Sequence, residues 1–202
     1  MTKSTSTSTR NASLTRKTKE TDIALSLNLD GTGNNSISTG VGFFDHMLTH
    51  LSKHSLIDLN VKASGDTHID DHHTVEDVSL VLGSALDMAL GDKRGIYRYG
   101  SASVPMEDAL ANVAIDLCGR PALVFNVTFP ARKIGAFDAE LVQESLRSLA
   151  NTAKMNLHVN VPYGSNAHHI AEAIFKALAK SLRSAVSTDP RNPDVPSTKG
   201  TL

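Results

Sequence analysis

The chain has 202 residues, and its 20 lysines and arginines nearly balance its 21 aspartates and glutamates, which gives a formal charge of −1. The basic residues are dispersed, and this excludes the concentrated positive charge of a protein that binds nucleic acid or an acidic membrane. No apolar run reaches the roughly 18 residues that a membrane-spanning helix needs. The single cysteine, Cys118, excludes an intramolecular disulfide and fits a reducing compartment. We therefore expect a compact cytoplasmic protein without nucleic-acid or membrane partners.

The predicted elements form two similar series between two tails. Residues 1–12 begin with a Ser/Thr-rich stretch that lacks an apolar segment, and we expect them to be a disordered tail. In the first series, residues 13–94, alternating apolar residues predict strands and helical spacing predicts helices. The expected strands are 14–20, 23–29, 35–39 and 57–63, and the expected helices are 43–54 and 71–90.

The second series, residues 95–187, repeats this order. The expected strands are 97–104, 109–117, 121–129 and 155–161, and the expected helices are 138–153 and 167–187. The additional residues around Phe129–Gly135 have the composition of a loop. Residues 188–202 contain Pro190, Pro193 and Pro196, which cannot continue the last helix, so we expect an extended tail.

The two series align with each other as an internal duplication. Phe43–Leu48 matches Leu141–Leu146, and the match continues without a gap into the following strand. A length difference then falls in a turn, where such changes are tolerated. Each half has the order βββαβα. Two mixed sheets, each with helices on one face, predict one compact domain, an α/β sandwich of the α+β class.

A possible metal-binding motif occurs once in each half, as His72-His73-Thr74-Val75-Glu76 and as His168-His169-Ile170-Ala171-Glu172. On a helix, residues four apart lie about 40° apart around the axis and adjacent residues about 100° apart. The first histidine and the glutamate can therefore grip one ion, while the second histidine must point at another. One copy alone could be two surface histidines at a helix end. Two copies at matching positions favour a site for two metal ions.

The alignment of the halves adds two ligand candidates, because it places His46 opposite Glu144 on the preceding helix. The eight candidates are His46, His72, His73, Glu76, Glu144, His168, His169 and Glu172, enough for four ligands on each of two ions. Imidazole with carboxylate suits Mn, Fe or Zn better than Mg or Ca, and the lack of thiolate ligands argues against a structural zinc site. The same alignment places Glu20 opposite Asp108, and it places Cys118 in a turn, where we interpret it as structural.

These segments resemble the imidazoleglycerol-phosphate dehydratase family of histidine biosynthesis. The resemblance covers Ser13 to Leu202 and is carried by Gly42–Leu48, Asp71–Asp77, Arg98–Ser101, His168–Ala177 and Pro196–Gly200. It implies a duplicated half-unit of the ribosomal protein S5 domain 2-like fold, and two Mn²⁺ ions per active site. It also implies a homo-oligomer, assembled as a large symmetric shell with interfacial active sites. The chain departs from the family at Glu144, where many members have histidine, and at His50, where many have glutamine.

The resemblance implies a dehydratase that converts D-erythro-imidazole glycerol phosphate to imidazole acetol phosphate and water. No carbonyl acidifies the proton that is removed, so the imidazole ring must accept the electrons, held as an imidazolate between two ions that act as Lewis acid and template. By resemblance and by alternation, one ion takes His46, His73, His168 and Glu172. The other ion takes His72, Glu76, Glu144 and His169.

Proton transfer requires a group that does not ligate metal. Glu20 matches a substrate-contacting glutamate of the family and is the leading candidate, with Asp108 as the second; without the resemblance, Glu20 would be a solvated charge beside Lys17 and Lys19. The resemblance assigns substrate or phosphate binding to Glu20, His50, His54, Arg98, Arg120, Lys176, Ser197, Thr198 and Lys199, because cations and hydroxyls suit phosphate oxygens.

Three aspartates, Asp70, Asp71 and Asp77, flank the first motif, where they could orient the ligating histidines or cap the helix. Two other classes of protein share parts of this pattern. A metal-dependent hydrolase would use a similar pair of ions with a bridging hydroxide. A metal-storage shell of the ferritin type would also assemble, but it would carry Glu-x-x-His motifs on long bundle helices.

Overall fold

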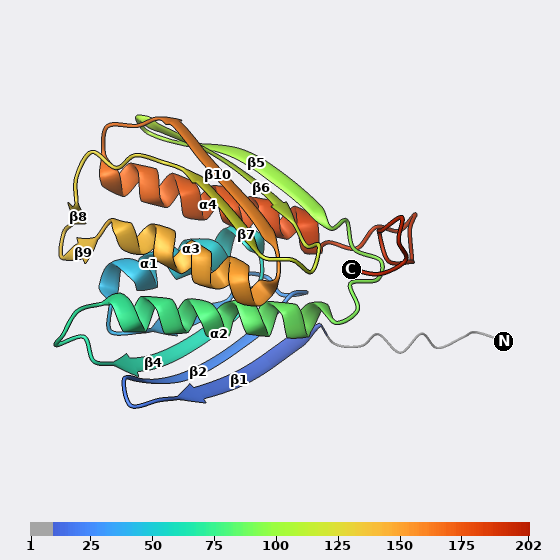
Figure 1. Cartoon of the computed structure of the whole chain (residues 1–202), viewed down its shortest axis with the longest axis horizontal. Helices are drawn as coiled ribbons and strands as arrows, with labels where there is room; N and C mark the ends of the chain where they lie inside the picture. The colour runs from blue at the N-terminus through green and yellow to red at the C-terminus, as the bar shows by residue number, and fades with distance from the viewer. Residues whose placement is uncertain (1–9) are drawn as a thin grey trace.

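The computed structural model describes residues 10–202, which form two four-stranded sheets with four long helices between them (Figure 1). The predicted disordered tail lies outside the described residues, except that its last residues, Asn11 and Ala12, already belong to the first strand. The first half contains β1 (Asn11–Lys17), β2 (Thr21–Asn28), β3 (Asn35–Ser38), α1 (Gly42–Ser55), β4 (Asp58–Gly65) and α2 (His72–Leu90). The second half contains β5 (Tyr99–Met106), β6 (Ala109–Asp116), β7 (Ala122–Asn126), α3 (Glu140–Ala153), β10 (Asn156–Tyr163) and α4 (Ala167–Val186).

The two sheets have the same topology. Their strand orders are β1-β2-β4-β3 and β5-β6-β10-β7, and in each sheet the last pair is parallel while the others are antiparallel. A helix joins each parallel pair, as such a connection requires. The structure therefore confirms the α+β class and the duplicated βββαβα half-unit.

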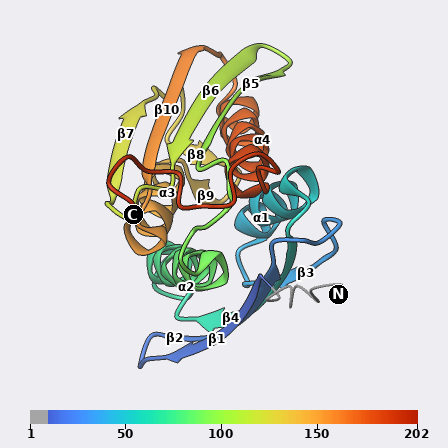
Figure 2. The ribbon, with the colours of Figure 1, turned by 90° about the vertical axis from the view of Figure 1, so that its right-hand side faces the viewer.

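The helices form two layers between the sheets. Helices α1 and α2 pack on the first sheet, and α3 and α4 pack on the second. Helix α2 then packs against α3, and α1 packs against α4, so that the layers run sheet, helix, helix, sheet (Figure 2). The side chains of strand β2 explain why the helices cover one face of the sheet. Ile23, Leu25 and Leu27 are buried on its helix-facing side, while the residues between them are more exposed. Both halves share one apolar core.

Small residues bring α2 and α3 close together. The hydroxyls of Ser79 and Ser145 lie 2.9 Å apart inside this helix pair. A Cβ at Gly83 would lie 2.2 Å from Oγ1 of Thr152, so only glycine fits at this crossing. This close packing of α2 on α3 joins the two halves as one unit.

Several strand boundaries differ from the sequence expectation. Strand β5 spans 99–106 and not 97–104, and β7 ends at Asn126 and not at 129. Strand β1 ends at Lys17 because the hydroxyl of Thr18 accepts hydrogen bonds from the backbone N–H groups of Glu20 (3.1 Å) and Thr21 (3.0 Å) and closes a turn. Glu20 therefore lies in the β1–β2 turn and not at the end of a strand. The expected loop around Phe129–Gly135 contributes a short strand, β8 (Lys133–Ile134), which pairs with β9 (Phe137–Asp138).

The C-terminal tail has no helix or strand and folds back on the second half. Gly95 accepts a hydrogen bond from Asp189 N (2.8 Å) and donates one to Asp194 O (3.0 Å), so the tail begins beside the connection from α2 to β5. The Arg98 guanidinium donates to the carbonyl of Pro196 (2.8 Å). The tail therefore lies at the end of the molecule where α2 and α4 finish (Figure 1).

Candidate active site and metal-binding residues

The two copies of the motif open helices α2 and α4 with the same geometry. Nε2 of His72 lies 3.8 Å from Glu76, and Nε2 of His168 lies 3.1 Å from Glu172, as expected for residues one turn apart. The planes of the adjacent rings are nearly perpendicular, at 86° for His72 and His73 and at 87° for the second pair. Each copy therefore directs one histidine toward its own glutamate and the other histidine elsewhere.

Helices α1 and α4 bring one set of predicted ligands together, which we call the α1–α4 half-site. It consists of His46, His50, His168 and Glu172, in which Nε2 of His46 and of His168 lie 3.5 and 3.1 Å from Oε2 of Glu172. Nε2 of His50 lies 3.4 Å from the other oxygen and 3.2 Å from Nε2 of His46. His50, which the sequence assigned only to substrate, therefore belongs to a group of donors that could hold a metal ion.

The protonation states in this half-site suit cation binding. Burial raises the pKa of Glu172, but the hydrogen bond from Lys176 and the positive charges around it outweigh burial and bring the pKa to about 2. Burial lowers the pKa of His50 to about 4, although Glu172 opposes the shift. A deprotonated carboxylate and a neutral imidazole are the forms that bind metals.

The corresponding residues on α2 and α3 are His72, Glu76 and Glu144, which we call the α2–α3 half-site. Glu144 lies on the helix that packs against α2, where it pairs with Arg147 and accepts a hydrogen bond from Ser148 (3.5 Å). Over residues 10–202, the α1–α4 half-site provides the only three donors from His, Cys, Asp or Glu that lie within 4.8 Å of one another. The second half-site is therefore more open.

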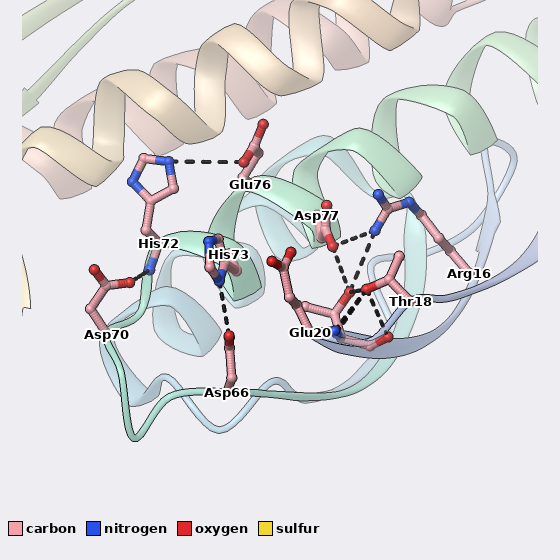
Figure 3. A network of polar contacts seen from close by, with 10 residues as sticks. Arg16, Thr18, Glu20, Asp66, Asp70, His72, His73, Glu76 and Asp77 are labelled. Atoms are coloured by element: carbon pink, nitrogen blue, oxygen red, sulfur yellow. Dashed lines mark hydrogen bonds and ion pairs between the residues drawn. The ribbon is translucent and has the colours of Figure 1, made fainter.

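The remaining ligand candidates, His73 and His169, are held by carboxylates of their own halves. Asp66 accepts a hydrogen bond from Nδ1 of His73 (3.0 Å), and Asp108 accepts one from Nδ1 of His169 (2.5 Å); Figure 3 shows the first pair. The first bond raises the pKa of His73 and lowers that of Asp66. In both pairs Nε2 remains available, which is the usual arrangement of a metal-binding histidine with an orienting carboxylate.

Sequence reasoning missed Asp66. It lies seven residues before its histidine, in the turn where the two halves differ in length, and no spacing rule connects the two positions. In the second half, Asp108 holds His169 in the same way, although the alignment of the halves matches Asp108 with Glu20 and not with Asp66. The duplication therefore conserves the task of holding the histidine while changing the residue that performs it.

The two predicted proton-transfer residues occupy different environments. The Glu20 carboxylate points toward the His73 ring (Figure 3), and its charge contributes to the raised pKa of that imidazole. Asp108 instead uses both oxygens, because it also accepts hydrogen bonds from Ser165 N (2.5 Å), Ser165 Oγ (2.7 Å) and Asn166 N (3.0 Å). The hydrogen bonds from His169 and Ser165 hold the pKa of Asp108 well below its usual range. The surroundings of Glu20 suit proton transfer better.

The three aspartates that flank the first motif have separate tasks. Asp70 accepts a hydrogen bond from the backbone N–H of His72 (2.8 Å), whereas the side chain of Asp71 makes no capping bond. Burial and the neighbouring charge of Asp70 raise the pKa of Asp71. Asp77 is buried and pairs with Arg16 and the Thr21 hydroxyl (Figure 3). None of the three contacts the imidazole ring of a predicted ligand, so their predicted role in orienting those rings is wrong and belongs to Asp66 and Asp108.

Apart from Glu20, which lies beside His73, the predicted substrate-binding residues separate into two groups. Lys176 and His54 lie beside the α1–α4 half-site, where Lys176 Nζ is 2.6 Å from Glu172 and the His54 ring stacks on His50. At the other end, a pocket of about 650 Å³ is lined by residues that include Arg98, Arg120, Ser197, Thr198 and Lys199. Both groups are cationic, as phosphate binding requires.

The length of helix α4 gives the distance between these two groups of residues. Arg98 N donates to the carbonyl of Ala185 (2.9 Å), near the end of the helix, whereas His168 lies at its start. At 1.5 Å per residue, the pocket and the predicted metal ligands at the start of α4 are roughly 25 Å apart. Arg98 is also bound to Asp116 (2.6 and 3.0 Å) as well as to Pro196, so it anchors the tail in addition to any role toward phosphate.

Comparisons with known proteins agree with one another. The sequence model of the imidazoleglycerol-phosphate dehydratase family matches residues 39–182. Imidazoleglycerol-phosphate dehydratases from Cereibacter sphaeroides and Roseobacter denitrificans are 58% and 59% identical over 194 residues, which cover 96% of this chain and all of theirs. The Staphylococcus aureus enzyme structure superposes with a TM-score of 0.81 at 38% identity, over 89% of this chain and 99% of that one. The Pyrococcus furiosus enzyme, in complex with (S)-C348, gives 0.82 at 34% identity, over 94% and 100%.

Proposed function

The chain belongs to the imidazoleglycerol-phosphate dehydratase family, as a hydro-lyase of histidine biosynthesis, and we propose that it acts through two divalent ions bound between subunits. Its reaction removes water from D-erythro-imidazole glycerol phosphate and gives imidazole acetol phosphate. We propose Mn²⁺ as the resident ion. The observation that carries the proposal is the division of the ligands within one chain, which leaves each half-site one histidine short.

The donors fit two such ions. Three of the ligands expected for the first ion, His46, His168 and Glu172, meet in the α1–α4 half-site, while the fourth, His73, pairs with Asp66 and is not part of that group of donors. The second set is divided in the same way, since His169 is held by Asp108 away from the α2–α3 half-site. Imidazole and carboxylate donors suit a first-row divalent ion. Each missing imidazole must then come from another subunit.

The substrate leads to the same conclusion. A three-carbon chain links its imidazole ring to its phosphate, so it cannot span the roughly 25 Å between the metal ligands and the tail pocket of one chain. Lys176, His54 and the half-site of one subunit must therefore meet the tail pocket of another. A homo-oligomer with interfacial active sites satisfies both requirements. We propose that it is a large symmetric shell, in which every interface can repeat the same contact.

The chain's own residues have defined tasks in this site. When bound, the ions supply Lewis acidity toward the imidazole ring. Asp66 and Asp108 orient the bridging histidines, and the cations of the tail pocket fix the phosphate. Glu20 lies beside His73 with a carboxylate that no described side chain binds, so it can accept the carbon-bound proton or return one to the departing hydroxyl.

The two rival classes receive no support. The family that the chain belongs to contains lyases, and no specific feature of the half-sites favours a hydrolase over it. A ferritin-type storage shell requires long bundle helices, whereas here the ligands lie at helix starts between two sheets. The order of the ligands in each motif also differs from that of ferritin-like sites.

We also propose that the protein works in the cytoplasm. The one cysteine, Cys118, is buried and unpaired, as suits a reducing compartment. Within residues 10–202, no helix combines the length and apolar character that crossing a bilayer requires.

The test is an assay of imidazole glycerol phosphate turnover with protein that is first stripped by a chelator and then reloaded with Mn²⁺. We expect activity to disappear on stripping, and to return in proportion to Mn²⁺ until two equivalents per chain are bound. Release of water without hydrolysis of the phosphate ester separates the lyase from a hydrolase. Full turnover by uniformly loaded protein with one equivalent would contradict the two-ion site.

A further inference from the structure

One predicted ligand, His168, is not held by an orienting carboxylate. His73 and His169 are each held by an aspartate through Nδ1, whereas among residues 10–202 the one carboxylate that pairs with the His168 ring is Glu172, its expected co-ligand. The His168 side chain is also 42% exposed. An exposed imidazole with a single side-chain hydrogen bond can take several staggered rotamers. Packing must therefore fix the orientation of this ring.

The ring of Phe43 provides such packing. Phe43 lies at the start of α1, and its ring centroid is 5.3 Å from that of His168, with the two ring planes inclined by 65°. Aromatic pairs favour an edge-to-face contact of this kind. The same ring lies 6.5 Å from the ring of His46, the neighbouring predicted ligand. Phe43 therefore borders two of the imidazoles in the α1–α4 half-site.

Phe43 packs in turn against the β8–β9 hairpin. This hairpin lies beside the starts of α3 and α4 (Figure 1). It buries Ile134 and Phe137, and the ring centroid of Phe137 is 5.1 Å from that of Phe43. The hairpin is formed by the segment through which the second half is longer than the first. The added segment therefore supports His168 through one intermediate ring.

The α2–α3 half-site provides an internal comparison. The alignment of the two halves places Leu141 at the position of Phe43, and His72 at the position of His168. Nε2 of His72 lies 3.8 Å from its glutamate, whereas Nε2 of His168 lies 3.1 Å from its own. The histidine and the glutamate are therefore closer in the copy that has the aromatic neighbour.

We propose that Phe43 is a positioning residue of the active site, which holds the His168 imidazole with Nε2 directed toward the ion that it shares with Glu172. Phe43 acts through contact with the imidazole and takes no part in proton transfer. A ring that already points at the ion loses less side-chain freedom when the ion binds. The loss of Phe43 should therefore weaken the binding of one ion and leave the other unchanged. This inference rests on the proposed two-ion function.

The first test replaces the aromatic ring. Phe43→Leu introduces the residue that the repeat carries at this position, Leu141, so the variant should fold. Calorimetric titration of the stripped full chain with Mn²⁺ should show one binding step weakened by about 2- to 10-fold, the factor that corresponds to one aromatic pair. Phe125→Leu is the matched control, because Phe125 is also a half-buried phenylalanine packed on the core but lies on β7. It should change neither step. Two unchanged steps in Phe43→Leu, or equal losses in both variants, would overturn the inference.

The second test measures the orientation of the imidazole without metal. In crystals of stripped Phe43→Leu, we expect the His168 ring to move away from Glu172 or to occupy more than one rotamer, and in stripped Phe125→Leu we expect it to stay 3.1 Å from the carboxylate. A single unchanged ring position in Phe43→Leu would overturn the inference. Unmodified protein that binds fewer than two Mn²⁺ ions would instead contradict the proposed function, since the ring position in stripped crystals does not depend on metal.

Discussion

Replacement of Asp108 by asparagine tests how the chain holds His169, which we propose as a metal ligand for another subunit. Oδ2 of Asp108 accepts three hydrogen bonds from Ser165 and Asn166, and Oδ1 accepts one from Nδ1 of His169. An asparagine has one acceptor oxygen, which will face the three donors. Its NH₂ group must then face His169, so that Nδ1 becomes an acceptor and the proton moves to Nε2.

The expected magnitude follows from this change of tautomer. Nε2 is the atom left for the metal ion, and a proton on it blocks ligation until the tautomer reverts. Loss of an orienting partner of a ligating histidine typically costs about 10- to 100-fold in metal affinity. We expect a loss in this range at one ion, with the other ion bound as in the unmodified protein. Calorimetric titration of stripped protein with Mn²⁺ measures both steps.

The result also separates two roles for Asp108. A positioning residue loses metal affinity on substitution, whereas a proton-transfer residue loses kcat with both ions still bound. Asp22→Asn is the matched control, because Asp22 is exposed at the start of β2 and, among residues 10–202, its carboxylate pairs with Lys17 and with no histidine. Wild-type affinity at both ions in Asp108→Asn would refute the tautomer argument.

Three further predictions address the reaction, the assembly and the fold. Glu20→Gln should lower kcat by roughly 10²- to 10⁴-fold with metal content intact; a change of only a few-fold, comparable to that of Glu140→Gln, would remove Glu20 from the reaction. Chelation should release smaller oligomers and Mn²⁺ should restore the large one, because an ion that binds only the assembled form stabilises it; light scattering that shows one mass in both states across a dilution series would contradict metal-linked assembly. Asp58 accepts backbone hydrogen bonds from Thr32 and Asn34, which lower the pKa of its carboxyl in the folded chain. The carboxylate therefore stabilises the fold at pH values above its unfolded pKa of about 3.9. This stabilisation is lost as the pH falls through the lower folded pKa. Asp58→Asn should therefore lower the free energy of unfolding by about 1 kcal/mol at pH 7 and by less at pH 2. Denaturant titrations at both pH values measure this difference, and equal losses would show that the charge of Asp58 is not involved.

The sequence pattern predicts best the helices that occur in both halves and bury one apolar face. Helix α2 was expected at 71–90 and spans 72–90, and α4 was expected at 167–187 and spans 167–186. Both carry long apolar faces at helical spacing, and the duplication provided each prediction with an independent copy. The pairing of His72 with Glu76 and of His168 with Glu172 followed from one turn of helix, a distance that the sequence specifies directly.

Contacts set by turns and by helix packing were not predictable in the same way. The end of β1 depends on a hydroxyl, that of Thr18, which competes for backbone N–H groups that a strand would otherwise use. The hold of Asp66 on His73 depends on how the β4–α2 turn folds. His50 joined the metal donors because α1 and α4 cross where residues one turn apart on α1 face the same carboxylate, and no periodicity specifies which helices cross.

The divergence of adjacent histidines constrains the assembly that we propose. In that assembly each chain keeps two incomplete half-sites and offers two imidazoles, those of His73 and His169, which carboxylates of the same chain hold. A contact that joins an imidazole of one copy to a half-site of the next is heterologous, since the two surfaces differ. Heterologous contacts either close into rings or continue as open filaments. Because every chain of the proposed assembly both donates and accepts at two places, full occupancy of the proposed metal sites requires closure in more than one direction, which a closed shell provides and a simple dimer does not.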